Sequence, residues 1–228
     1  MRILLLLASW VGTLLIPIVV VFSILTGLFF DASFYHAGQA KYQVQSVTGM
    51  APDQMDRVNV GIIRFFAGTE SLHQAISASG GSPDVFKEKE ILHMDDVRVI
   101  VQFISKVQIV GLLVLAVVVG LAAGTWARGG RLALSRALTY GAIFTIALVI
   151  VSGILTYTSF DSLFITFHEV TFNNNYWELD PRTDHLIQMF PFGFWYDAML
   201  TVALRVLLVS VVLGTCGVVL GRLERRRV

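Results

Sequence analysis

The sequence predicts an all-α membrane protein with four transmembrane helices and an extracellular cap that is mostly helical and irregular. Only 14 % of the 228 residues are charged and 55 % are hydrophobic, and the mean hydropathy is +0.72. A soluble domain carries about a quarter charged residues. Four apolar stretches also reach the roughly 20 residues that a helix needs to cross a bilayer. They are residues 3–30, 99–127, 137–157 and 198–220.

The first apolar stretch has the leucine-rich start that is also found in a cleaved signal peptide. Its apolar core is longer than the usual stretch of about 7–15 residues, and no clear small-residue cleavage site follows it. We therefore interpret it as a retained helix, bent near Pro17.

The basic residues indicate how the chain crosses the membrane. Lys and Arg are enriched on the cytoplasmic side of membrane proteins. One side would carry eight basic residues against Glu224 alone, namely Arg2, Arg128, Arg131, Arg136, Arg222, Arg225, Arg226 and Arg227. We therefore expect one multi-pass domain in the cell membrane, residues 1–228, with both termini, the loop 128–136 and the tail 221–228 in the cytoplasm. The polar segments 31–98 and 158–197 would then face outward and carry the active site.

The first outer segment contains two recognisable helical patterns. Pro52–Ala67 has apolar residues at helical spacing and predicts a short amphipathic helix. After a glycine pair, Ser82 is suited to be an N-cap and Pro83 to be the first helical residue. We expect a helix to begin there and to run through His93 into the second span.

Histidines are the first candidates for chemistry, because imidazole exchanges protons near neutral pH. All five lie in the outer segments. For His36, His73 and His185 we prefer a structural role. His93 precedes Asp96 by three residues, so that a helix would place this carboxylate where it can orient the ring. His168 follows the third span, and the two rings could meet in one site or lie apart as unrelated interfacial residues.

The second outer segment is rich in aromatic residues. An aromatic belt at the membrane surface accounts for several of them, but polar residues are interleaved with the rings, including Asn173, Asn174, Asn175, Asp180 and Asp184. Apolar walls with a few polar groups suit a lipid-handling site. Lys106 and Arg205, several residues inside their spans, either snorkel to the headgroups or hold lipid or oxyanion charge.

Two sequence blocks resemble the lipoprotein intramolecular transacylase family. The first block is His93-Met94-Asp95-Asp96-Val97. The second runs through Phe167-His168-Glu169, Phe172-Asn173, Trp177, Asp180-Pro181, Asp184-His185-Leu186-Ile187 and Phe190-Pro191. Phe192 departs from the pattern, because we expect an acidic residue at this position.

The resemblance implies four membrane helices with an extracellular cap. It also implies an acyltransferase that moves the sn-2 acyl chain of a diacylglyceryl lipoprotein to the amine of its N-terminal cysteine, giving the lyso-form lipoprotein. The family's catalytic histidines fall on His93 and His168. Supporting residues would be Asp96, Glu169, Asn173, Trp177, Asp180 and Asp184, with Lys106 and Arg205 as candidate lipid or oxyanion contacts. We expect no metal, no cofactor and no nucleic-acid partner.

Aminolysis of an ester needs a proton acceptor and a proton donor but no enzyme nucleophile. The single cysteine, Cys216, lies near the cytoplasmic end of the last span, which fits this route. Two other functions remain open from the residues. One is a metal-dependent membrane hydrolase, although no His-Glu-x-x-His spacing occurs. The other is a non-enzymatic membrane sensor or scaffold whose cap binds a ligand.

Overall fold

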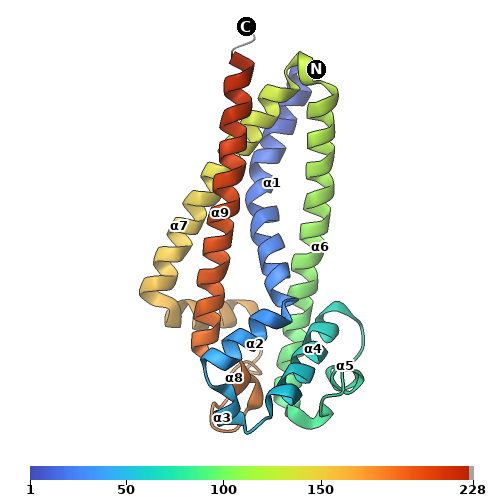
Figure 1. The fold of residues 1–228 in the computed structure, drawn as a ribbon, viewed down its shortest axis with the longest axis vertical. Helices are drawn as coiled ribbons and strands as arrows, with labels where there is room; N and C mark the ends of the chain where they lie inside the picture. Colours follow the sequence, from blue (N-terminus) through green and yellow to red (C-terminus); the bar gives the residue numbers. More distant parts are fainter. Residues whose placement is uncertain (226–228) are drawn as a thin grey trace. The chain divides into compact units, whose positions relative to one another are not determined.

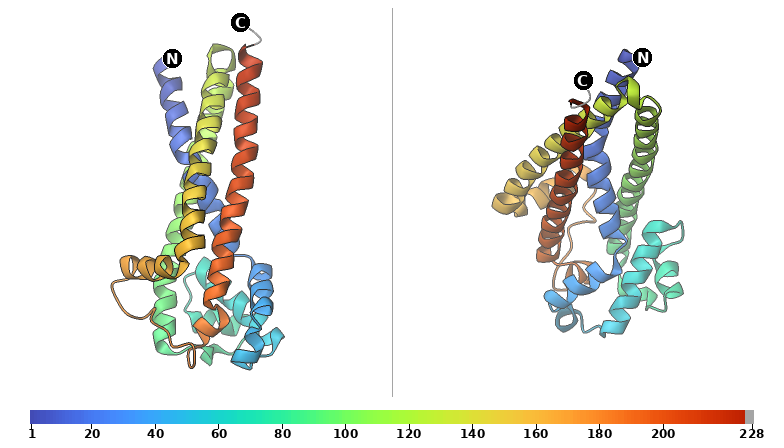
Figure 2. Two further views of the ribbon diagram at one scale, coloured as in Figure 1. Left: turned by 90° about the vertical axis from the view of Figure 1, so that its left-hand side faces the viewer. Right: turned by 45° about the horizontal axis from the view of Figure 1, so that its top comes forward.

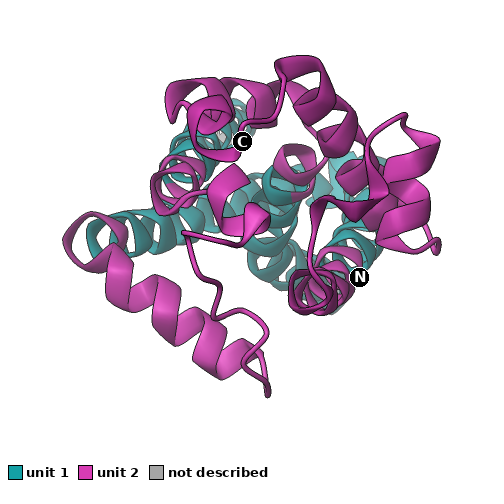
Figure 3. Cartoon of the chain, turned by 90° about the horizontal axis from the view of Figure 1, so that it is seen from below, with its two compact units in different colours: residues 1–25, 104–155, 200–228 teal, residues 26–103, 156–199 magenta. Residues whose placement is uncertain are grey.

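The computed structural model describes residues 1–225, so Arg226 and Arg227 of the basic tail lie outside the described residues. The described chain is helical and contains no strand. It divides into two compact units, coloured in Figure 3. The first unit consists of Met1–Leu25, Ile104–Leu155 and the chain from Leu200 onward. The second consists of Thr26–Phe103 and Thr156–Met199.

Four helices are long and apolar enough to cross a membrane. They are α1 (Arg2–Phe29), α6 (Glu88–Gly124), α7 (Gly130–Thr171) and α9 (Phe192–Arg225) (Figure 1). The fold-class prediction of an all-α protein with four such helices is therefore confirmed. Three of the helices extend beyond the apolar stretches of the sequence, because polar turns continue them. The helix α6 begins eleven residues before residue 99, α7 ends after residue 157, and α9 begins before residue 198.

The first unit is packed through small residues, as membrane helices generally are. A buried cluster joins α1 to α9 through Ile16, Val20 and Val206. On α6, Gly111 faces Val19 of α1 so closely that a Cβ atom would lie 2.5 Å from the valine side chain. The Ser135 hydroxyl donates a hydrogen bond of 2.8 Å to the carbonyl oxygen of Gly217. Close backbone approach therefore replaces the interlocking large side chains of a soluble core.

The second unit holds the short helices α2 (Ala32–Lys41), α3 (Val44–Thr48), α4 (Pro52–Ala67), α5 (Leu72–Ala78) and α8 (His185–Met189), and the 3-10 turn η1 (Pro83–Val85). A second 3-10 turn, η2 (Trp126–Arg128), belongs to the first unit. The amphipathic helix predicted over Pro52–Ala67 is confirmed with the same bounds, and its apolar residues Met55, Val58 and Ile62 are buried. They face α5, which lies beside α4 (Figure 1).

The start of α6 differs from the prediction. Ser82 makes no side-chain cap, Pro83 opens only the turn η1, and the backbone at Phe86 is extended. The helix begins instead at Glu88, because the Glu90 carboxylate accepts a hydrogen bond of 2.8 Å from the backbone N–H of Lys87. This contact is one half of a capping box. From Glu88 the helix runs through His93 into the apolar stretch, as expected.

The helix α7 is interrupted two residues after the end of the predicted third span, residues 137–157. α7 continues to Thr171, but Ser159 has φ −150° and ψ 35°, which is not helical. The last three turns, orange in the left panel of Figure 2, therefore form a separate helical segment of residues 160–171. This segment carries His168.

Candidate active site

His93 and His168 come together in the second unit. Their ring centroids lie 5.9 Å apart with an angle of 37° between the ring planes. Each residue is 8 % exposed. His93 lies on the polar first turns of α6 and His168 follows the break at Ser159, so both are outside the apolar stretches that are long enough to cross a bilayer. Of the two arrangements that the sequence left open, the structure therefore has the one in which the rings meet.

The orientation of His168 is set by its own helix. Its Nδ1–H donates a hydrogen bond of 2.6 Å to the carbonyl oxygen of Phe164, one turn earlier. A carbonyl oxygen can only accept, so the proton is on Nδ1. In the neutral ring, Nε2 therefore carries the free lone pair and is the atom that can accept a proton.

The orientation of His93 does not come from Asp96, contrary to the sequence interpretation. The Asp96 carboxylate accepts a hydrogen bond of 2.9 Å from Nδ2 of Asn174. Nδ1 of His93 is buried and has no hydrogen-bond partner among the described residues. Asp96 instead holds the loop after α7 against α6. Asn174 was not singled out from its asparagine run, because three adjacent asparagines give no signal for which one points inward.

Aromatic rings surround the pair. Phe172 contacts both histidines, with its ring centroid 5.1 Å from His93 and 5.6 Å from His168. The ring centroids of Phe164 and Trp177 lie 4.3 Å and 5.1 Å from that of His168. Trp177, which the family resemblance named as a supporting residue, is therefore one of the rings around the histidines. The sequence alone did not indicate that Phe164 or Phe172 touches the histidines. Among many aromatic residues, only the chain path selects those that touch the histidines.

Burial decides the protonation of the pair. Burial, and to a smaller extent the neighbouring His168, lowers the pKa of His93 to about 4, against the opposing effect of Asp96. Burial also lowers the pKa of His168, against the opposing effect of its hydrogen bond to Phe164. Both rings are therefore neutral at pH 7, because burial away from water disfavours the charged imidazolium form.

Several predicted supporting residues lie elsewhere. Glu169 and Asn173 are exposed, and neither contacts the histidines in the described residues. Asp180 forms an ion pair with Arg182, and Asp184 forms one with Lys87. Lys106 and Arg205 are exposed on helices of the first unit. His36 pairs with Asp56, His73 is exposed, and His185 donates to the Val85 carbonyl, in agreement with structural roles.

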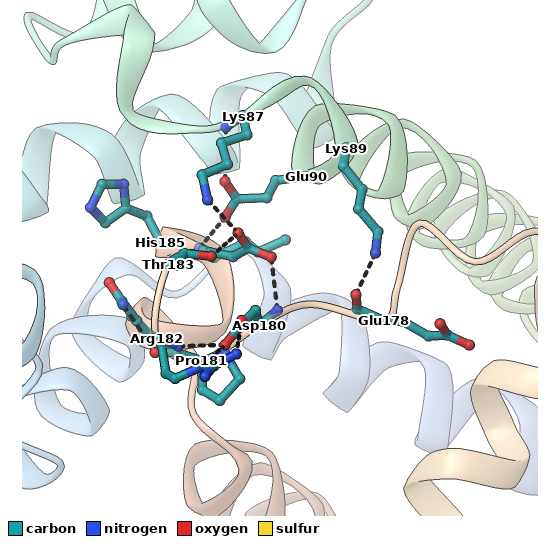
Figure 4. A network of polar contacts seen from close by, with 12 residues as sticks. Lys87, Lys89, Glu90, Glu178, Asp180, Pro181, Arg182, Thr183 and His185 are labelled. Atoms are coloured by element: carbon teal, nitrogen blue, oxygen red, sulfur yellow. Dashed lines mark hydrogen bonds and ion pairs between the residues drawn. The ribbon is translucent and has the colours of Figure 1, made fainter.

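Asp184 and Glu90 belong to a network of polar contacts that holds the loop after α7 to the start of α6. Figure 4 shows Lys87, Lys89 and Glu90 of this network beside Glu178 and Asp180. The Glu90 carboxylate is fully buried and accepts hydrogen bonds from the backbone N–H groups of Lys87 and Leu186. Asp184 accepts from the Lys87 ammonium at 2.7 Å and from the backbone N–H of Asp180 at 2.8 Å. The Lys87 hydrogen bond holds the pKa of Asp184 below its usual range.

This network explains why the second sequence block contains acidic residues that do not touch the histidines. Lys89 also donates to the carbonyl oxygen of Glu178 in the same loop. Trp177 lies directly before these anchored residues, and Asn174 lies three residues earlier. The acidic residues therefore position the loop and not the reacting atoms. Among residues 1–225, no group of three or more His, Cys, Asp or Glu side chains is arranged to hold a metal ion.

The fold and the site together define a membrane-integral, all-α protein with a buried histidine pair among aromatic rings. Comparison with known proteins is specific about its family. The family described as "Lipoprotein intramolecular transacylase Lit" matches residues 10–195, which is most of the chain. This protein therefore belongs to the Lit family of lipoprotein intramolecular transacylases, and the predictions of that family and of an enzyme are confirmed.

Individual relatives agree with this assignment. The crystal structure of the membrane-integral transacylase Lit from Bacillus cereus superposes with a TM-score of 0.85 at 19 % identity, covering 99 % of this chain and 100 % of that chain. A Bacillus cereus Lit variant with one histidine replaced by arginine gives a TM-score of 0.78 at 19 % identity, covering 97 % of this chain and 94 % of that chain. At this identity the likeness shows the shared fold.

A sequence relative is found in Aquifex aeolicus (strain VF5), an uncharacterized protein that is 31 % identical over 134 residues. The match covers 58 % of this chain and 56 % of the Aquifex protein, so it spans little more than half of either one.

We predict that Glu90→Ala destabilises the second unit, whereas Glu88→Ala does not. Glu90 is buried and satisfies two backbone N–H groups, while Glu88 is exposed on the same helix. Each unsatisfied buried donor costs about 1–3 kcal/mol. Thermal unfolding in detergent should show a lower melting temperature for Glu90→Ala alone, with faster protease cleavage in residues 172–184. Equal melting temperatures for the two variants would contradict the positioning role.

Proposed function

We propose that this protein transfers the sn-2 acyl chain of a diacylglyceryl lipoprotein to the amine of the lipoprotein's N-terminal cysteine, giving the lyso-form lipoprotein. The observation that carries the proposal is the buried pair of neutral imidazoles, His93 and His168, whose ring centroids lie 5.9 Å apart. General acid–base catalysis needs groups within hydrogen-bond reach of one reacting centre. The family membership supplies the reaction class. Diacylglyceryl lipoproteins and membrane lipid are the partners that this reaction requires.

The reaction proceeds by aminolysis of an ester. The substrate amine reacts as the free base, after its ammonium form has released one proton to water. Its nitrogen forms a C–N bond to the sn-2 ester carbonyl carbon, and Nε2 of His168 accepts a proton from this nitrogen. The tetrahedral intermediate then breaks its C–O bond, and the glyceryl oxygen leaves with the proton that His168 accepted. The products are an amide and a free hydroxyl, with both histidines neutral again. His93 is suited to donate a hydrogen bond to the oxyanion or the leaving oxygen.

Both reacting groups belong to one substrate molecule, so proximity contributes much of the rate. The aromatic residues around the histidines exclude water, which would otherwise compete with the amine for the ester. No covalent acyl-enzyme is needed, and the free thiol of Cys216 belongs to the first unit. We propose that Trp177 and Phe172 form walls for the reacting groups, and that the exposed side chains of Lys106 and Arg205 reach lipid headgroups by snorkelling.

The mechanism predicts that His93→Ala and His168→Ala each reduce transacylation by about 10²–10⁴-fold, because general acid–base catalysis is lost. The assay incubates a diacylglyceryl lipopeptide with the protein and analyses it by mass spectrometry. The product is the N-acyl, lyso-glyceryl isomer, which has the same mass as the substrate but a different fragmentation pattern. Cys216→Ser should keep its activity and serves as the control. Full activity of the double histidine variant, or an acyl group trapped on Cys216, would overturn the mechanism.

The pH dependence follows from the lowered pKa values of the two histidines. A base acts in its neutral form, so its contribution is present above its pKa and is lost as the pH falls through that value. The pKa of His93 is about 4 and that of His168 is also lowered, whereas an N-terminal amine has a pKa of about 7.7–8.0. We expect the rate at low substrate concentration to rise from pH 6 to about pH 8 with the free amine and then to level off. A fall in rate between pH 7 and 9 would show that a protonated histidine is required and would contradict this assignment.

We also propose that residues 31–98 and 158–197 face outward and that both termini are cytoplasmic, because of the eight-to-one basic excess on the other side. Ser77 and Arg128 are exposed positions in the two regions to be compared. Single cysteines at these positions, in a Cys216→Ser background, should react differently with an impermeant thiol reagent. In intact cells only Ser77→Cys should be labelled, and both should be labelled after lysis. Labelling of Arg128→Cys alone in intact cells would reverse the topology.

A further inference from the structure

Residues 160–171 form a short helix with three distinct faces. The face that packs within the second unit is made by Phe160, Phe164 and His168, four residues apart. A second face is polar and exposed, with Asp161, Ser162, Thr166 and Glu169. At 100° per residue, the direction opposite Asp161 is that of Val170. The helix therefore has a polar side and an opposite apolar side. Its packed edge, with Phe160, Phe164 and His168, lies between them.

The apolar side is largely uncovered by the described residues, although the Phe167 ring touches Phe172 at its edge and Leu163 is half-buried. Phe167 is 52 % exposed and Val170 is 80 % exposed, and Leu163 lies on the same side. Ile165 is the one apolar side chain on the polar side, and it is 47 % exposed. Within the second unit, large apolar residues of the other helices are mostly buried in one core. The exposed apolar side thus needs an occupant that the chain itself does not provide.

We propose that residues 160–171 lie in the plane of the membrane surface, with Phe167 and Val170 in the lipid and Asp161 and Glu169 in water. The chain enters this helix directly from the apolar stretch 137–157, whose last residue, Tyr157, is of a type enriched at the headgroup level. The break at Ser159 allows the helix to change direction there. A helix with one apolar and one charged side binds in the interface, with its apolar side at the boundary between headgroups and acyl chains. Continuity with a bilayer-crossing stretch selects lipid over other occupants.

This placement has a consequence for the site, and the consequence rests on the proposed function. His168 is on the packed edge of the same helix, between the polar and the apolar sides. Its ring would therefore be held at the boundary between headgroups and acyl chains. The glyceryl esters of a lipid-anchored substrate lie at this depth, so the helix would bring the base to the ester without lifting the acyl chain out of the membrane.

The test compares Val170→Cys with Asp161→Cys, each in a Cys216→Ser background. The two positions are exposed and lie on opposite sides of the helix. Each cysteine is labelled with the polarity-sensitive fluorophore NBD, and the full-length protein is reconstituted in phosphatidylcholine–phosphatidylglycerol vesicles. Quenching by acyl-chain doxyl lipid reports contact with lipid, and quenching by iodide reports contact with water. Leu163→Cys provides a second reading of the apolar side, and circular dichroism checks that each variant is folded.

At position 170 we expect blue-shifted emission and at least threefold stronger quenching by doxyl lipid than at position 161, where iodide should be the stronger quencher. Equal access of iodide to both positions would overturn the proposal. A label at position 170 that neither quencher reaches, and that becomes accessible on dilution of the protein in lipid, would identify a second copy of this chain as the occupant. Because these measurements do not depend on activity, their failure would leave the proposed transacylation intact.

Discussion

The buried carboxylate of Glu90 is the constraint on which the site depends. It lies one helical turn before His93 and accepts two hydrogen bonds from backbone N–H groups. One donor is Lys87 at the start of α6, and the other is Leu186 in α8, directly after the loop. Burial of a carboxylate is costly unless hydrogen bonds compensate for lost water. These two contacts therefore require α6 and the loop to be assembled together. In this way a single side chain couples the position of His93 to that of a segment almost a hundred residues later.

The loop then completes the surroundings of the histidines. Asn174 and Trp177 lie between the end of α7 and the anchored residues 178–186, and they contact Asp96 and His168 respectively. A loop of this length would be mobile if it were held only at its ends. The Lys87–Asp184 pair and the Lys89 contact attach it along its course, as Figure 4 shows. The polar network thus supplies rigidity to a site whose own walls are apolar.

The sequence predicted what depends on composition and local periodicity. Apolar length identified the four long helices, and the spacing of Met55, Val58 and Ile62 identified α4. The positions of His93 and His168 next to apolar stretches left open whether the rings meet, and only the family resemblance placed both in one site. The sequence could not predict the partner of Asp96. On a helix, a carboxylate three residues after a histidine can contact either the imidazole ring or another segment of the chain. Asp96 contacts Asn174 because the loop after α7 passes beside it.

The start of α6 was misplaced for a related reason. Ser-Pro is a strong local signal for a helix start, but it competes with a tertiary contact that is invisible in the local sequence. Phe86 is buried with an extended backbone, and the carboxylate of Glu90 caps the helix at Lys87, five residues after Ser82. Tertiary burial prevailed over local preference. The same reasoning accounts for Asp184, whose carboxylate accepts hydrogen bonds from the distant Lys87 and from the backbone N–H of Asp180. Asp180 itself pairs with its near neighbour Arg182.

Phe192 shows how the site orients a histidine without a carboxylate. At this position we expected an acidic residue, but the phenylalanine ring packs 4.8 Å from Phe160 and 5.2 Å from Phe164, and Phe164 in turn contacts His168. A carboxylate among these rings would favour the imidazolium form and raise the pKa of His168. Its replacement by an apolar ring keeps the imidazole neutral, and the Phe164 carbonyl fixes the tautomer instead. His168 is thereby oriented by a backbone carbonyl oxygen and not by a carboxylate, which suits the proposed reaction, in which an oxyanion forms beside the histidines.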